Sequence, residues 1–236
     1  MFHFCLAMLS AATGETAMAS VPTTLRIRRA LEDAIVQGRY LPGTRLDPEA
    51  LEQEFDCSRT PIREAFQQLE ASGLVRVMPK RGTFVTHWSP EELAERFEVM
   101  AEIEASCGRL AARRISHAEL DIFHEVHEDC RRLAEAGEVE AYYARNSEFH
   151  HCIYRATHNA FLTQEAARLH AMLQPYRRMQ LQVRNRMTRS FAEHDAIVAA
   201  IRGGDAEAAA RALHDHVIVQ GDRFHDLIAA MRQTLA

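Results

Sequence analysis

Residues 57–66 read CSRTPIREAF, and this stretch predicts the helix around which the first domain is organised. Ser58 is a suitable N-cap, and Pro61 falls in the first turn, where a helix tolerates a residue without an amide hydrogen. The apolar residues recur at helical spacing and predict one buried stripe: Ile62, Ala65, Phe66 and Leu69. The opposite face is predicted to meet solvent and carries Arg59, Thr60, Arg63 and Gln67.

Elements on both sides of this helix complete a defined order. A first helix is predicted over 24–38 and a second over about 48–55, with Asp47 as its cap and Pro48 at its first position. A turn at 41–44 separates the two. Two strands, 74–78 and 83–86, flank the basic turn PKRG at 79–82. Three short helices followed by a hairpin indicate a winged helix-turn-helix domain.

The exposed face of the third helix carries the donors that DNA binding requires. The N-terminal end of such a helix enters the major groove, and Arg59 and Arg63 lie there one turn apart. An arginine can pair with guanine through two hydrogen bonds. Lys80 and Arg81, at the turn of the hairpin, are predicted to reach the DNA backbone or the minor groove. A plain solvated helix face would also carry arginines, but the complete order of elements favours DNA binding.

The pattern changes after Ser89, where glycine and proline become sparse and long amphipathic patterns follow one another. Helices are predicted near 90–114, 116–136, 138–158, 160–183, 188–202 and 205–232. The fold class is therefore mainly α, a winged domain with a small β-hairpin followed by an all-helical bundle. The predicted division is a disordered or mis-assigned leader at 1–20, a winged domain at 21–86, a linker at 87–89 and a helical domain at 90–236.

Composition agrees with a cytoplasmic globular protein. The five cysteines stand singly, without a CxxC pair, which is typical of reduced thiols. The net charge is −5, so the chain as a whole is not basic, but residues 21–86 hold ten Lys and Arg against nine Asp and Glu. A domain with nearly equal numbers of positive and negative residues can still have its arginines clustered on one DNA-binding face. The apolar run near the N-terminus is too short to span a membrane.

The motifs of the first 86 residues resemble those of the GntR family of regulators, in particular SRTPIREA at 58–65, GLV at 73–75 and RGTFV at 81–85. Within that family the chain is most similar to the FadR-type branch, whose second domain is the all-helical FCD domain; the resemblance covers about 22–232. It implies DNA contacts from Ser58, Arg59, Thr60, Arg63, Arg81 and Gly82. The chain departs from several relatives at 48–50, where it reads PEA in place of an early arginine.

Histidines dominate the second half, with eleven of thirteen after Trp88. Asn146 and His150 are four residues apart and share one helix face, while His194 and His216 lie on later helices. Three imidazoles and an oxygen ligand inside a bundle can hold Zn²⁺ or another divalent ion, Ni²⁺ and Mn²⁺ included. Spacing alone equally allows a set of hydrogen-bonded histidines. The resemblance implies the metal site, with Asn146 where many relatives have Asp.

The resemblance also implies a small effector, an organic or sugar acid, bound near the metal. At the position of Met100, relatives often have an arginine that points toward the effector. Arg186 and Arg189 are candidates to replace that arginine in this chain. The remaining histidines of this part of the chain receive no role, among them His151, His158, His170, His214 and His225. The helix at 90–114 is expected to connect the effector pocket to the DNA-binding domain.

These observations predict a transcription regulator, more often a repressor, that binds a pseudo-palindromic operator as a homodimer under the control of a metabolite. No nucleophile elbow or glycine-rich phosphate loop is present in the sequence. Two alternatives remain open here. One is a metal-dependent enzyme with Glu193 as general base and the first domain as an accessory arm. The other is a pure dimerisation module.

Overall fold

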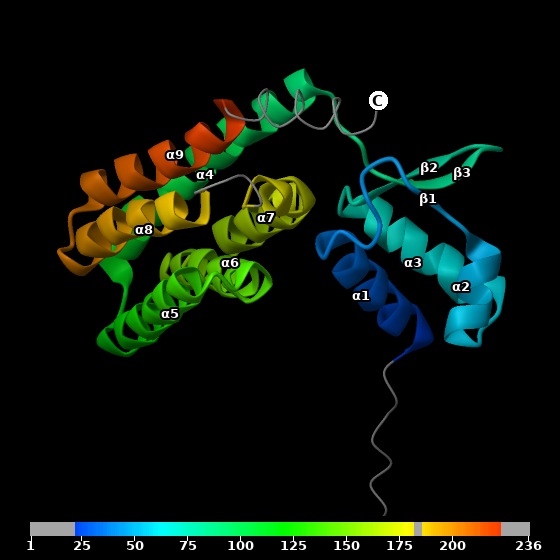
Figure 1. Cartoon of the computed structure of the whole chain (residues 1–236), viewed down its shortest axis with the longest axis horizontal. Helices are drawn as coiled ribbons and strands as arrows, with labels where there is room; N and C mark the ends of the chain where they lie inside the picture. Colours follow the sequence, from blue (N-terminus) through cyan, green and yellow to red (C-terminus); the bar gives the residue numbers. More distant parts are fainter. Residues whose placement is uncertain (1–21, 182–185, 223–236) are drawn as a thin grey trace, which may run out of the picture.

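The computed structural model describes residues 22–181 and 186–222, and these form two side-by-side bodies (Figure 1). One hydrophobic core is built by residues between Ile27 and Val85, and a second by residues between Leu93 and Val217. The architecture is mainly helical with one small sheet, which confirms the predicted fold class. The predicted leader at 1–20 lies outside the described residues.

The first body has the predicted order of elements. It comprises α1 (Thr23–Val36), α2 (Pro48–Phe55), α3 (Arg59–Ala71), β2 (Val75–Met78) and β3 (Gly82–Val85). One strand was not predicted: β1 (Arg45–Leu46) pairs antiparallel with β3 and gives the sheet order β1-β3-β2. A strand of two residues is too short for an alternating pattern to develop, so sequence periodicity cannot reveal it.

The N-caps of α2 and α3 differ in a way that matters for function. The Asp47 carboxylate accepts a hydrogen bond from the Glu49 amide, as predicted. Ser58 occupies the N-cap position of α3, but its hydroxyl makes no capping bond within the described part of the chain. The Ser58 side chain is exposed and is therefore available to an external partner.

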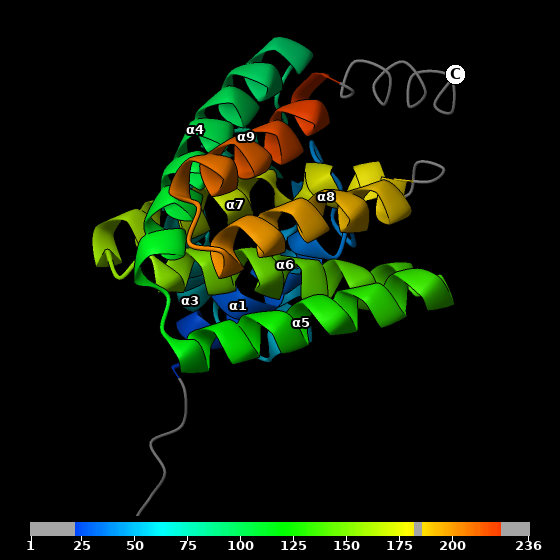
Figure 2. The ribbon, with the colours of Figure 1, turned by 90° about the vertical axis from the view of Figure 1, so that its left-hand side faces the viewer.

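The second body is a bundle of six helices within the described residues (Figure 2). Its helices are α4 (Pro90–Arg114), α5 (His117–Ala136), α6 (Val139–Ala156), α7 (Ala160–Leu181), α8 (Arg186–Arg202) and α9 (Ala206–Asp222). The predicted end of the last helix, beyond 222, lies outside the described residues. In the part of the chain that the structure describes, no helix is long and apolar enough to cross a membrane.

Helices α4 and α9 lie against each other along their length (Figure 2). Gly108 on α4 permits this approach, because a Cβ atom there would lie 2.4 Å from a methyl carbon of Leu213 and 2.9 Å from the Ala209 carbonyl oxygen. The Ser89 hydroxyl and the Glu92 carboxylate form a capping box that fixes the start of α4 immediately after the linker. Helix α7 packs both within the bundle and against α1 of the first body.

Candidate DNA-binding surface and metal centre

Helix α3 is amphipathic in the predicted sense. Its buried residues are Ile62, Ala65, Phe66 and Leu69. Arg59, Thr60 and Arg63 are exposed on the other face, and the Arg59 side chain is 59% accessible. Its guanidinium Nε lies 3.8 Å from a Glu52 carboxylate oxygen, a distance at which a solvent-exposed ion pair contributes little. Arg59 can therefore exchange this contact for another partner at little cost.

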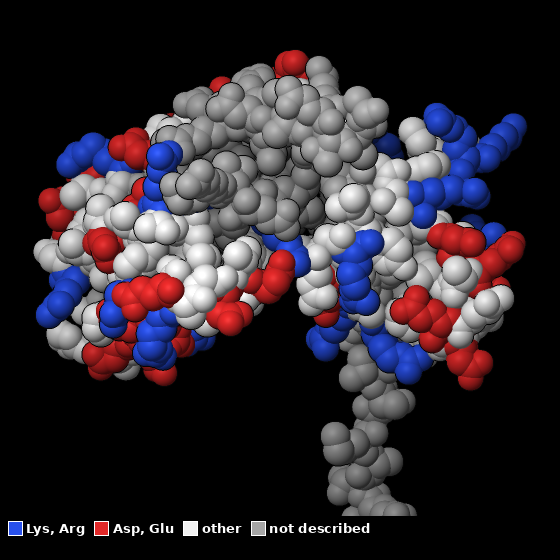
Figure 3. All heavy atoms as spheres, in the orientation of Figure 1, with Lys and Arg blue, Asp and Glu red and all other residues white. Residues whose placement is uncertain are grey.

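The hairpin β2–β3 stands beside α3 and forms a groove with it. Arg59, Arg63, Lys80, Gly82 and Thr83 are among the residues that line this groove. Lys80 has a left-handed backbone with φ of 62°, which turns the chain at the hairpin tip and leaves the ammonium group exposed. Arg81 is also exposed. Lys and Arg side chains project from the hairpin end of the molecule in Figure 3.

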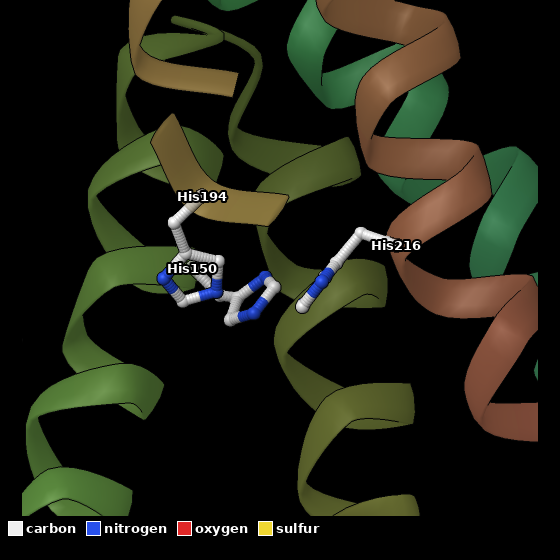
Figure 4. A group of neighbouring side chains, drawn as sticks. All are labelled: His150, His194 and His216. Carbon is white, nitrogen blue, oxygen red and sulfur yellow. The ribbon is translucent and has the colours of Figure 1, made fainter. Parts of the chain in front are cut away.

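The three predicted histidine ligands converge inside the bundle (Figure 4). His150 comes from α6, His194 from α8 and His216 from α9, and one ring nitrogen of each lies within 4.8 Å of the others. All three side chains are buried. Side chains from three separate helices thus meet at one point, where together they could hold a metal ion.

Carboxylates fix the orientation of two of these rings. Nδ1 of His150 lies 2.8 Å from Glu104, and Nδ1 of His216 lies 2.6 Å from Glu193. A neutral imidazole that donates from Nδ1 keeps its lone pair on Nε2, which is the atom a metal would bind. Glu104 was not anticipated from the sequence, because a single glutamate on a long amphipathic helix looks like part of a solvated face.

Burial keeps these histidines neutral. Loss of hydration lowers the pKa of His150 and of His194 well below the ordinary value of 6.5, and neighbouring positive groups lower both further. The pKa of His216 is also lowered by burial, although the hydrogen bond to Glu193 opposes this. Neutral imidazoles are the form that coordinates a metal, so protonation does not block these ligands at neutral pH.

Buried polar atoms without hydrogen-bond partners are a second, independent observation in favour of a bound divalent ion. Both ring nitrogens of His194 and Oδ1 of Asn146 are buried, and they have no hydrogen-bond partner among the described residues. An unsatisfied buried polar group costs about 1–3 kcal/mol, so native proteins rarely leave such atoms without a partner. A metal ion bound to one ring nitrogen of His194 would satisfy that atom, and Oδ1 of Asn146 could be satisfied in the same way.

A buried arginine that the sequence analysis did not select enters the same site. The Arg177 guanidinium donates to Nε2 of His150 at 2.9 Å and to the Glu104 carboxylate at 3.3 Å. It also lies 3.2 Å from Nδ1 of His170, to which we had assigned no role. Tyr154 donates its hydroxyl to Glu104 at 2.7 Å. The sequence gives no signal for Arg177, because it stands in a run of polar residues on α7.

The two arginines predicted to meet an effector lie in different environments. Arg186 is buried and forms a bidentate pair with Glu193, at 2.9 and 3.0 Å. Arg189 is exposed on the same helix. Met100 is fully buried in the core. Of the other histidines, His151, His158 and His214 have carbonyl or carboxylate partners, and His225 lies outside the described residues.

Glu193 is poorly suited to the general-base role that an enzyme would require. Burial alone would raise its pKa, but hydrogen bonds from His216 and Arg186 outweigh this effect and hold the pKa at about 2. Both carboxylate oxygens are engaged by these partners. A base that works near neutral pH needs a pKa far closer to 7.

The linker between the two bodies is attached to the bundle through α7. The Tyr176 hydroxyl accepts a hydrogen bond from the Trp88 amide at 3.1 Å and donates one to the Thr86 carbonyl at 3.2 Å. The Arg96 guanidinium lies 3.5 Å from the centre of the Trp88 ring, within cation–π range. Thr86, just before the predicted linker, and Trp88 within it are therefore held by the helical domain.

Comparisons with known families agree with this arrangement. The profile of the bacterial regulatory proteins of the gntR family matches residues 23–85, and that of the FCD domain matches residues 95–218. The chain is 28% identical over 192 residues to a probable D-xylose utilization operon transcriptional repressor of Paenarthrobacter nicotinovorans, covering 78% of this chain and 80% of that protein. It is 28% identical over 210 residues to the galactonate operon transcriptional repressor of Escherichia coli, covering 80% and 91%.

Solved structures show the same fold. Escherichia coli McbR/YncC superimposes with a TM-score of 0.74 at 22% identity, covering 92% of this chain and all of that one. A GntR-type putative regulator from Rhodococcus sp. RHA1 gives a TM-score of 0.71 at 20% identity, covering 88% and 98%. The two relatives are described as a probable and an established transcriptional repressor, and the Rhodococcus protein as a putative transcriptional regulator.

Proposed function

Because this chain belongs to the GntR family of bacterial regulatory proteins and carries an FCD domain, we propose that it is a repressor whose operator binding is controlled by a small acid. It is a transcription regulator and not an enzyme. The proposal of repression is supported by its relatives, among which a D-xylose utilization operon regulator and a galactonate operon regulator are both repressors.

The exposed face of α3 is the observation that carries the DNA-binding part of the proposal. Arg59 and Arg63 read base edges in the major groove, and Ser58 and Thr60 bind phosphate or base beside them. The wing residues Lys80, Arg81 and Gly82 contact the backbone. One α3 helix reads only a few base pairs, so two copies acting as a homodimer on a pseudo-palindrome supply the length of site and the affinity.

The histidine cluster is the regulatory site in this proposal. His150, His194 and His216 hold one divalent ion, with Asn146 as the fourth ligand, and Zn²⁺, Ni²⁺ and Mn²⁺ are the candidates. The ion supplies open coordination positions for the carboxylate and hydroxyl oxygens of an organic or sugar acid. Arg186 acts on this site through Glu193, which orients His216, and Arg189, exposed on the same helix, is the second candidate to meet the acid.

Metal analysis and operator binding test the proposal together. Protein purified without a polyhistidine tag should carry one divalent ion per chain in native mass spectrometry, and the His194→Ala variant should carry none. Aldonic and hydroxy acids should then be titrated against the protein by calorimetry, with and without operator DNA. An inducing acid should bind more weakly in the presence of operator, because coupling between two sites is reciprocal. Acid binding that His194→Ala leaves unchanged would contradict the proposed site.

A further inference from the structure

Arg177 lies where it competes with a metal ion for a ligand atom. Its Nη2 is 2.9 Å from Nε2 of His150, and the Nδ1 of the same ring is held by Glu104. In this tautomer Nε2 has one lone pair in the plane of the ring. That lone pair can accept a hydrogen bond from a guanidinium or coordinate a cation, but it cannot do both.

The Arg177 guanidinium is buried and has partners besides His150. Arg177 is 4% exposed, and its Nη1 contacts both Glu104 at 3.3 Å and His170 at 3.2 Å. The planar guanidinium is therefore hydrogen-bonded through both Nη1 and Nη2. A shift that frees Nε2 of His150 therefore also rearranges the contacts of Arg177 with Glu104 and His170.

The residues on either side of Arg177 reach the DNA-binding domain. Tyr176 bonds to the Trp88 amide and the Thr86 carbonyl, and the Thr86 amide is in turn bonded to the Leu74 carbonyl beside β2. Arg178 approaches the Val36 carbonyl at the end of α1, at 3.5 Å. Pro175 lies inside α7 immediately before Tyr176, where it removes a helical hydrogen bond and makes local movement easier.

We propose that Arg177 and a divalent cation compete for Nε2 of His150, and that Tyr176 transmits the exchange to the linker and so to the DNA-binding domain. The inference rests on the proposed function, because the cation site is the cluster of His150, His194 and His216. It assigns the transmission to α7, whereas the sequence suggested the helix at 90–114. Arg177 is a positioning residue here, since it acts on the cation through His150.

Zinc affinity measured against a chelating dye, on the full-length chain, tests the competition. Arg177→Gln should bind Zn²⁺ at least tenfold more tightly than wild type. Arg168→Gln is the matched control, because Arg168 lies on the same helix but is paired with Glu165 at the surface. Its Zn²⁺ affinity should equal that of wild type. Unchanged or weaker binding by Arg177→Gln would overturn the competition.

A second variant separates competition from simple charge repulsion. Arg177→Lys keeps a positive charge beside Glu104, but its single ammonium cannot reach two partners as a planar guanidinium does. It should also bind Zn²⁺ more tightly than wild type. Affinity equal to wild type for Arg177→Lys, with tighter binding for Arg177→Gln, would assign the effect to charge and overturn the competition. This variant also serves if Arg177→Gln fails to fold.

Trp88 provides a direct readout of transmission, because it is the one tryptophan in the chain and lies in the linker. Addition of Zn²⁺ should change its fluorescence in wild type. Tyr176→Phe should bind Zn²⁺ with wild-type affinity and show no such change. A wild-type spectrum that does not respond while Zn²⁺ binds would overturn the role of Tyr176. If neither wild type nor Arg177→Gln binds Zn²⁺, the metal site itself fails, and the competition fails with it.

Discussion

Nδ1 of His216 lies 2.6 Å from the Glu193 carboxylate, on α9 and α8 respectively. The same carboxylate holds Arg186 through two hydrogen bonds. Glu104 plays the equivalent part for His150 on the other side of the cluster. Two of the three converging rings are thus fixed in one tautomer by carboxylates, and this preorganisation is what favours a metal site over an ordinary group of buried histidines.

Replacing Glu193 should weaken metal binding without removing a ligand. In Glu193→Gln the neutral amide no longer raises the basicity of His216, and the loss of such a partner typically costs about 10–100-fold in metal affinity. Glu207→Gln is the control, because Glu207 pairs with Arg109 on the surface of the same bundle. Competition with a chelating dye measures both variants. Equal Zn²⁺ affinities for Glu193→Gln and wild type would show that Glu193 does not support the site.

Two substitutions of Asn146 should change the metal affinity in opposite directions. Asn146→Asp provides a charged oxygen to a dication and should tighten binding, whereas Asn146→Ala removes the fourth ligand and should weaken it. The buried, unpartnered Oδ1 of Asn146 is the structural reason. Calorimetric titration with Zn²⁺ gives both affinities. If the two variants shifted in the same direction, Asn146 would not be a ligand.

Alanine substitutions in α3 and in the β2–β3 hairpin should affect operator binding in different ways. Arg59→Ala or Arg63→Ala should cost about 1–3 kcal/mol of operator binding and relax specificity at the base that is read. Lys80→Ala should weaken binding to all duplexes and reduce the salt slope by about one unit, as a lost phosphate contact does. Fluorescence anisotropy at several salt concentrations separates the two effects. A uniform loss for all three variants would contradict the assignment.

As the pH falls, the helical domain should lose stability at a higher pH than the protonation of carboxylates alone would cause. The pKa values of His150, His170 and His194 are lowered well below 6.5 by burial, while in the unfolded chain they return to about that value. Below pH 6.5 the unfolded state therefore binds more protons, so the free energy of unfolding falls as the pH falls. Urea midpoints measured with a chelator present, from neutral pH downward, check this.

His170 allows the source of that acid sensitivity to be identified. His170→Gln removes one buried group and should make the loss of stability with falling pH shallower. His158→Gln should not, because His158 is half-exposed and pairs with Glu119 near the surface. Equal slopes for the two variants would mean that buried histidines do not cause the acid sensitivity.

The sequence was informative wherever a pattern repeats over several turns. The stripe from Ile62 to Leu69, the cap at Asp47 and the long helices after Ser89 were all predicted, because periodicity and capping are local properties. The strand β1 was missed because its stability comes from pairing with β3, which is a long-range contact. Local pattern cannot report such a contact.

Of the candidate metal site, only the candidate ligands were predicted from the sequence. His150 and Asn146 share a helix face and could be paired from spacing, with His194 and His216 as candidates on later helices, and the resemblance favoured one metal site made of all four. Glu104, Arg177 and Tyr176 could not be found in this way. Their roles depend on how α4 and α7 pack against α6 and the linker, and packing of this kind leaves no mark in a single sequence.

Selection of binding sites from a pool of random duplexes decides whether α3 reads a specific operator. Full-length wild type and the Arg59→Ala,Arg63→Ala double variant would be compared after circular dichroism has shown equal helix content. Wild type should enrich one inverted repeat, and the double variant should enrich none. Enrichment of the same repeat by the double variant, or of no sequence by wild type, would contradict the account.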